Sequence, residues 1–156
     1  MMSAALESWQ RAETPGPKKA LGISKPEVVS AMVKRGKRVL LVVGSEAPNV
    51  ETKDGDLVDS AIRLGKTGKV QVAATGHLLG EFAKRGFKDA FGVSLFNLGD
   101  RLKDAEWKGL DSKGSYDLVL VAGLPYYYEW LLLSGLKHFA SQLRIISLGR
   151  FYQPNA

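Results

Sequence analysis

Two runs of five consecutive apolar residues constrain the fold of this chain more than any other feature. They read Val39-Leu40-Leu41-Val42-Val43 and Leu118-Val119-Leu120-Val121-Ala122. A strand with one face in water alternates apolar and polar residues, so an unbroken apolar run indicates a strand that is covered on both faces. Such strands are typical of parallel sheets that carry helices on either side.

Further strand and helix patterns alternate with these two runs. We predict additional strands at 70–75, 93–97 and 144–148, and helices at 54–65, 77–85, 98–104 and 125–139. Strands that alternate with helices indicate a parallel sheet with right-handed crossovers. The sequence therefore predicts one three-layer, doubly wound α/β domain over residues 25–156, preceded by an N-terminal arm over residues 1–24.

The first helix of this domain has clear start and stop signals. We predict Ser24 as its N-cap, Pro26 in its first turn, and Gly36 as the residue that ends it. Its apolar residues recur at helical spacing and predict one buried face. These residues are Val28, Val29, Met32 and Val33.

Residue types that are rare or absent exclude several classes of protein. The chain of 156 residues has no cysteine, so it can form no disulfide and offers no thiolate to zinc or to an iron–sulfur cluster. Histidine occurs twice, as His77 and His138, and we predict no metal site. The sequence contains no run of eighteen apolar residues, so we predict no membrane span. The first residues also lack the apolar core of a signal peptide. We therefore expect a cytoplasmic protein.

The formal net charge of +6 points to several kinds of partner. The densest basic cluster, Lys34, Arg35, Lys37 and Arg38, falls at the end of the first predicted helix, where cations favour the negative end of the helix dipole. This local role is the first interpretation. An acidic protein partner is the second, and nucleic acid, which we do not predict as a partner, is the last.

Ligands of an open parallel sheet bind beyond the carboxyl ends of its strands. The turns at those ends contain small and polar residues that we treat as candidate cofactor contacts: Gly44, Ser45, Thr75, Gly76, His77, Asn97 and Gly123. Neither a G-x-G-x-x-G nor a Walker motif is present. Thr75-Gly76-His77 therefore has two interpretations, a tight strand-to-helix turn and a contact to a phosphate or flavin. No nucleophile accompanies His77 in a known pattern, and we predict no catalytic residue.

The helix at 125–139 is apolar around nearly its whole circumference. A helix that packs only on a sheet should show one apolar stripe, so the outer side of this helix needs cover. A second protein surface is one candidate for that cover, and the N-terminal arm of the same chain is the other. Our candidate interface residues are Trp107, Tyr126, Tyr127, Tyr128 and Trp130.

The loop at 104–117 carries the most distinctive motif of the chain. Trp107-Lys108-Gly109-Leu110-Asp111, followed by Gly114-Ser115-Tyr116-Asp117-Leu118-Val119, resembles the W-x-G-L-D-x-x-G-x-Y-D-x-V pattern of the epsilon subunit of the archaeal acetyl-CoA decarbonylase/synthase complex. Matches in the same order include Val42-Val43-Gly44, Ala73-Ala74-Thr75-Gly76, Tyr127-Tyr128 and the segment from Arg150 to Ala156. The likeness covers nearly the whole chain from Pro15.

This resemblance implies a fold, a complex and partners. The fold would be Rossmann-like, similar to the nucleotide-binding middle domain of thiamine-diphosphate enzymes, with five strands, or six where a terminal helix and strand follow Ala156. The chain would be a non-metal, non-catalytic subunit of the carbon monoxide dehydrogenase component, beside the nickel–iron–sulfur alpha subunit. It would stabilise that subunit or help electrons reach FAD, with no firmly bound cofactor of its own.

Two further hypotheses compete with this one. The alternative function is that of a free-standing flavin- or nucleotide-binding Rossmann-like protein, which would use the turns after the strands. The aromatic helix also predicts that the chain forms a homo-oligomer, because its outer side would meet a second copy.

Overall fold

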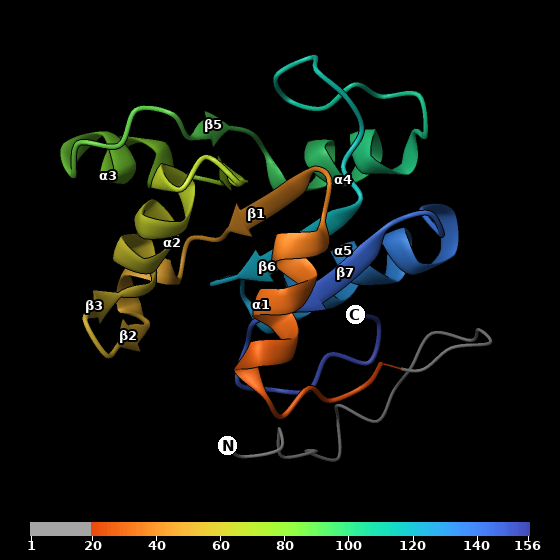
Figure 1. The fold of residues 1–156 in the computed structure, drawn as a ribbon, viewed down its shortest axis with the longest axis horizontal. Coiled ribbons are helices and arrows are strands. Elements are labelled where there is room, and N and C mark those ends of the chain that lie inside the picture. The colour runs from red at the N-terminus through yellow and green to blue at the C-terminus, as the bar shows by residue number, and fades with distance from the viewer. Residues whose placement is uncertain (1–19) are drawn as a thin grey trace.

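The computed structural model describes residues 20–156, which form a central parallel sheet with helices on both faces (Figure 1). The strands of this sheet are β1 (Val39–Val43), β4 (Val70–Ala74), β5 (Phe91–Gly92), β6 (Leu118–Ala122) and β7 (Arg144–Ser147). The helices are α1 (Pro26–Arg35), α2 (Leu57–Lys66), α3 (Leu78–Lys84), α4 (Leu95–Lys103) and α5 (Tyr126–Phe139). The predicted three-layer α/β architecture is confirmed.

The strand order is β5-β4-β1-β6-β7, and all pairs are parallel. The chain first builds outward from β1 through β4 to β5, and then crosses back to add β6 and β7 on the other side of β1. The switch in strand order therefore lies between β1 and β6, as in Rossmann-like folds. The predicted likeness to the middle domain of thiamine-diphosphate enzymes stays a prediction.

The two faces of β1 are covered by different helices. Val39, Leu41 and Val43 belong to one buried cluster, which contains side chains of α2 and α3 and contacts α1. Leu40 and Val42 belong to a second cluster, with side chains of α4 and α5. All five residues of β1 are buried, which explains why this strand has no polar position.

The predicted strand at 93–97 is wrong. The edge strand β5 ends at Gly92, and the chain becomes helical at Leu95, so the predicted short helix at 98–104 begins three residues earlier. Leu98 and Leu102 lie one helical turn apart, and both are buried in the second cluster. A segment of five residues is too short to show a strand or a helix period, and tertiary burial selects the helix here.

The predictions for α1 are confirmed in extent and corrected in detail. The helix spans Pro26–Arg35, but its N-cap is Lys25 rather than Ser24, without a side-chain hydrogen bond. Val28 is 44% exposed, because α1 packs against the first cluster only through Val29, Met32 and Val33. Most of the predicted N-terminal arm lies outside the described residues, and residues 20–24 are irregular and mostly exposed.

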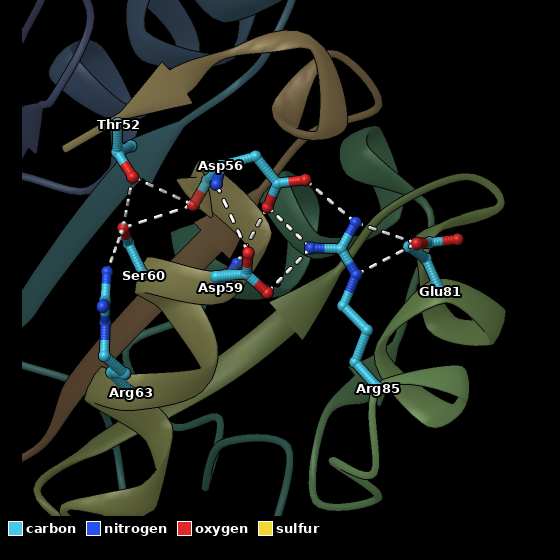
Figure 2. A network of polar contacts seen from close by, with 7 residues as sticks. All are labelled: Thr52, Asp56, Asp59, Ser60, Arg63, Glu81 and Arg85. Atoms are coloured by element: carbon cyan, nitrogen blue, oxygen red, sulfur yellow. Dashed lines mark hydrogen bonds and ion pairs between the residues drawn. The ribbon is translucent and has the colours of Figure 1, made fainter. Parts of the chain in front are cut away.

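A small antiparallel hairpin, β2 (Glu51–Thr52) and β3 (Gly55–Asp56), precedes α2 and was not predicted. Asp56 is the N-cap of α2 and forms a capping box with Asp59. Arg85, which follows α3, donates to both carboxylates and to Glu81 (Figure 2). This network holds the start of α2 against the end of α3.

The loop at 104–117 closes the amino edge of the sheet, meaning the edge at which the parallel strands begin. The guanidinium of Arg38, one residue before β1, donates to both carboxylate oxygens of Asp111 and to the Gly114 carbonyl. The Asp117 carboxylate accepts the backbone amides of Lys37 and Arg38, at 2.9 and 2.8 Å. The motif residues therefore attach this loop to the start of β1.

Tyr116 and Gln71 complete the same cluster. The Arg38 guanidinium lies 5.1 Å from the centre of the Tyr116 ring, a cation–π contact. The Tyr116 hydroxyl donates to the Gln71 side chain, which in turn donates to Asp111. Trp107 packs edge-on against Tyr116 and is half-buried in the second cluster. The hydrogen bonds from Arg38 are the main reason that the pKa of Asp111 lies well below its usual range.

We predict that Asp111→Ala lowers the free energy of unfolding by about 3 kcal/mol, because Arg38 would lose its counter-ion in a partly buried site. Chemical denaturation monitored by tryptophan fluorescence measures this loss. The control is Asp54→Ala, which removes an exposed ion pair to Arg63 at 3.7 Å and should change stability by less than about 0.5 kcal/mol. An Asp111→Ala protein as stable as wild type would contradict a stabilising role for the cluster.

Candidate functional site

A pocket of about 230 Å³ lies at the opposite, carboxyl edge of the sheet, beside the switch in strand order. Its walls come from the turns after β1, β4 and β6 and from the starts of α4 and α5. The lining residues are Ser45, Thr75, Gly76, Ser94, Leu95, Phe96, Leu124, Pro125 and Tyr128. The serine and threonine side chains of this lining therefore share the pocket with apolar and aromatic residues.

Three of the seven candidate cofactor contacts line this pocket, namely Ser45, Thr75 and Gly76. The predicted turn residue Asn97 instead lies exposed within α4, because the third strand ends earlier than expected. The same error concealed Ser94, Leu95 and Phe96, which lead into α4 and form one wall. A correct boundary between strand and helix at Gly92 would have identified them.

Gly44 and Gly123 allow two turns to pack against each other and do not line the pocket. A Cβ atom on Gly44 would lie 2.5 Å from the Gly123 carbonyl oxygen and from Leu124 Cδ2. Gly123 has a φ of +72°, and a Cβ atom there would lie 3.0 Å from Ala47. These glycines bring the ends of β1 and β6 together, and a role in contacting a ligand stays a prediction.

Thr75, Gly76 and His77 form the tight turn that was one of the two interpretations. The Thr75 hydroxyl donates to the Val43 carbonyl at 3.1 Å, which ties the end of β4 to β1. Gly76 has a φ of +62°, a conformation that favours glycine. His77 is the exposed N-cap of α3 and makes no side-chain capping bond. The tight turn accounts for a glycine at position 76 without a ligand, and a cofactor contact here stays a prediction.

The outer side of α5 and the neighbouring Phe96 of α4 form an exposed aromatic face, defined here as Phe96, Tyr127, Tyr128 and Leu131. Tyr127 is 74% exposed, and the Tyr128 ring packs edge-on against Phe96 at the rim of the pocket. Tyr126 and Trp130 are half-buried. Among the predicted interface residues, Tyr127 and Tyr128 thus point most strongly outward.

A buried carboxyl group lies on the other side of α5. Glu129 is 5% exposed and accepts a hydrogen bond from the Ser147 hydroxyl of β7. The C-terminal segment packs beside it: Gln153 is buried and donates to the Tyr126 carbonyl at 3.2 Å. Burial raises the pKa of Glu129 to about 7. Glu129 connects the aromatic helix to the last strand and faces away from the pocket residues.

Within residues 20–156, no group of three or more His, Asp or Glu residues could hold a metal ion. In the same part of the chain, no helix is long and apolar enough to cross a membrane. The fold and its pocket define a Rossmann-like α/β domain with a small hollow at the switch point.

Comparison with known proteins identifies the family. Residues 3–156 match the family described as CO dehydrogenase beta subunit/acetyl-CoA synthase epsilon subunit, and the chain belongs to this family. It is 36% identical to the acetyl-CoA decarbonylase/synthase complex subunit epsilon of Methanothrix soehngenii, over 95% of this chain and 76% of that protein. It is 38% identical to subunit epsilon 1 of Archaeoglobus fulgidus, over 85% of this chain and 69% of the relative. The family resemblance seen in the sequence is confirmed.

We predict that Gly44→Ala destabilises the protein by about 1–3 kcal/mol, because the added methyl group would push the Gly123 turn away from β1. Thermal and chemical unfolding measure the change. Gly80→Ala is the matched control: Gly80 lies in α3, nothing would touch its Cβ atom within 4 Å, and alanine should stabilise the helix slightly. Equal stability of Gly44→Ala and wild type would show that the two turns can separate freely.

The raised pKa of Glu129 predicts a pH-dependent stability. The folded protein keeps the Glu129 carboxyl protonated up to about pH 7, whereas the ordinary pKa of a glutamate in an unfolded chain is 4.5. Stability therefore falls as pH rises from 4.5 to 7, by about 2–3 kcal/mol. Glu129→Gln should not show this loss of stability. Its free energy of unfolding, measured by urea denaturation, should therefore rise relative to that of wild type between pH 5 and pH 8. Glu51→Gln, at an exposed position of the hairpin, controls for the removal of one charge. A constant difference between Glu129→Gln and wild type across this range would contradict the prediction.

Proposed function

We propose that this chain is an accessory, non-catalytic subunit of the carbon monoxide dehydrogenase component of the acetyl-CoA decarbonylase/synthase complex, and that it works in the cytoplasm. Its membership in the epsilon-subunit family over almost the whole chain carries the proposal. In this role it stabilises the large nickel–iron–sulfur alpha subunit. The sequence supports this division of labour, because a chain without cysteine cannot supply thiolates to such clusters.

The exposed aromatic face supports a role in assembly. Exposed aromatic side chains on a helix are typical of the central part of a protein interface. Trp107, the fifth predicted interface residue, is half-buried and packs against Tyr116 of its own chain. This packing favours a role in holding the loop at 104–117 over a role in contacting a partner.

Co-expression with the alpha subunit tests the proposal. A tagged copy of this chain should retain the alpha subunit through affinity purification and size exclusion, and should raise its thermal stability. The absence of association at micromolar concentrations would contradict the proposed function.

The pocket at the carboxyl edge favours a second role, in electron transfer to FAD. Its hydroxyl groups and aromatic wall suit one ring of a flavin, but its volume of about 230 Å³ is below the range of about 300–1,000 Å³ that encloses a whole drug-sized ligand. FAD, which accepts electrons when bound, would therefore be held weakly here. The alternative is a free-standing flavin- or nucleotide-binding protein. Titration of FAD into this chain alone and into its complex with the alpha subunit separates the two, because the alternative requires binding by the chain alone.

We also propose that the chain forms a homo-oligomer through the exposed aromatic face. Tyr127→Ala should weaken self-association by about thirtyfold, the equivalent of about 2 kcal/mol for an interface hot spot, with little loss of stability. Sedimentation velocity over a range of concentrations measures the association. Leu79→Ala, at an exposed position of α3 on another side of the domain, should associate like wild type. A wild-type chain that stays monomeric at high micromolar concentration would contradict self-association.

A further inference from the structure

Positive charge is concentrated on the amino edge of the domain. This edge comprises the last two residues of each helix and the segment that leads to the following strand, up to and including the first residue of that strand, namely 34–39, 65–70, 83–91, 102–118 and 138–144. These segments hold thirteen Lys and Arg residues against five Asp and Glu residues. Their excess of eight positive charges is larger than the net charge of +6 of the whole chain, so the remainder of the chain is slightly acidic.

Two neighbouring segments form the centre of this charge. Segments 34–38 and 65–69 contain six cations and no acidic residue. Arg38 pairs with Asp111, and we call the other five the basic edge: Lys34, Arg35, Lys37, Lys66 and Lys69. A hydrogen bond from Lys69 Nζ to the Gly36 carbonyl, at 2.5 Å, joins the two segments. All five cations are exposed, and none of them forms an ion pair with another residue of the described part of the chain.

The carboxylates of Asp111 and Asp117, which lie at the same edge of the sheet, are engaged in the fold and form no ion pair with the basic edge. Asp111 binds Arg38 and Gln71, and Asp117 accepts two backbone amides at the start of β1. Both carboxylates therefore point into the loop cluster rather than toward the five lysine and arginine side chains.

Helix dipoles explain only part of this arrangement. Lys34, Arg35 and Lys66 lie in the last turns of α1 and α2, where cations stabilise the helix. Lys37 and Lys69 lie beyond the helix ends, in the connections to β1 and β4. Lys37 adds exposed positive charge that no helix requires, whereas Lys69 Nζ donates to the carbonyl of Gly36, the C-cap of α1.

We infer that the basic edge docks this chain onto an acidic surface of a protein partner. This inference rests on the proposed function, which supplies the alpha subunit as the partner. Complementary charge of this kind steers encounter and makes the association rate depend on salt. A protein surface fits better than nucleic acid, because segments 34–38 and 65–69 contain no aromatic side chain that could stack on bases.

Two triple charge-reversal variants of equal net charge test the inference. The first combines Lys34→Glu, Lys37→Glu and Lys66→Glu, and leaves Lys69 and its bond to Gly36 intact. The matched control combines Lys25→Glu, Lys53→Glu and Arg150→Glu, three exposed cations outside the amino edge. Each variant changes the formal net charge from +6 to zero, so the two differ only in where the charge is lost. Circular dichroism and thermal melting establish that both are folded.

Binding to the purified alpha subunit is measured by biolayer interferometry between 50 and 300 mM salt. We expect association of the first variant to be at least about tenfold slower than wild type at low salt and nearly independent of salt, whereas the control behaves like wild type. Equal rates for the first variant and wild type would overturn the inference and leave the proposed function intact. No binding by wild type would overturn both. Tight binding of wild type to random duplex DNA at 150 mM salt, lost in the first variant, would assign the basic edge to nucleic acid instead.

Discussion

The complete burial of β1 is the constraint on which the rest of the structure depends. This strand pairs along its whole length with β4 on one edge and β6 on the other, and its side chains enter both apolar clusters. Both ends of a strand so enclosed must be fixed without exposing the core. At its start, Arg38 joins the loop at 104–117 through Asp111 and Gly114. At its end, Gly44 lets the turn after β6 approach to contact distance.

These two fixed ends give the two edges of the sheet different properties. At the amino edge, Asp111 and Asp117 are engaged within the fold and the five cations of the basic edge are exposed, whereas the carboxyl edge is hollowed and carries aromatic residues. The most distinctive sequence motif of the family belongs to the amino edge, where its aspartate, glycines and tyrosine hold the loop. A motif typical of this family therefore reports on the fold of the subunit more than on chemistry at the pocket.

Much of this fold could be predicted from the sequence, because the unbroken apolar runs at β1 and β6 have a single interpretation. The third strand could not, since its two residues are too few to show a period and the following segment fits a strand or a helix equally well. This misplaced strand also affected the candidate cofactor contacts: Asn97 was chosen, whereas Ser94 and Phe96 line the pocket. Ser45, Thr75 and Gly76, which follow correctly placed strands, do line the pocket. The role of Arg38 was not predicted either, because its partner Asp111 is 73 residues distant and nothing local links them.

The separation of β1 from β6 in sequence has a consequence for synthesis on the ribosome. The β1 strand can pair with β4 early, but its other edge stays open until residues 118–122 have been made. During that interval an apolar strand presents unsatisfied amides and carbonyls, the feature by which unfinished sheets pair with the wrong chain. The cluster of Arg38, Asp111 and Asp117 forms only when the segment directly before β6 arrives, so its closure coincides with the end of this exposed period. Fast translation of residues 44–122, or a chaperone that covers the open edge of β1, would shorten or prevent this exposure and so reduce mispairing with other chains.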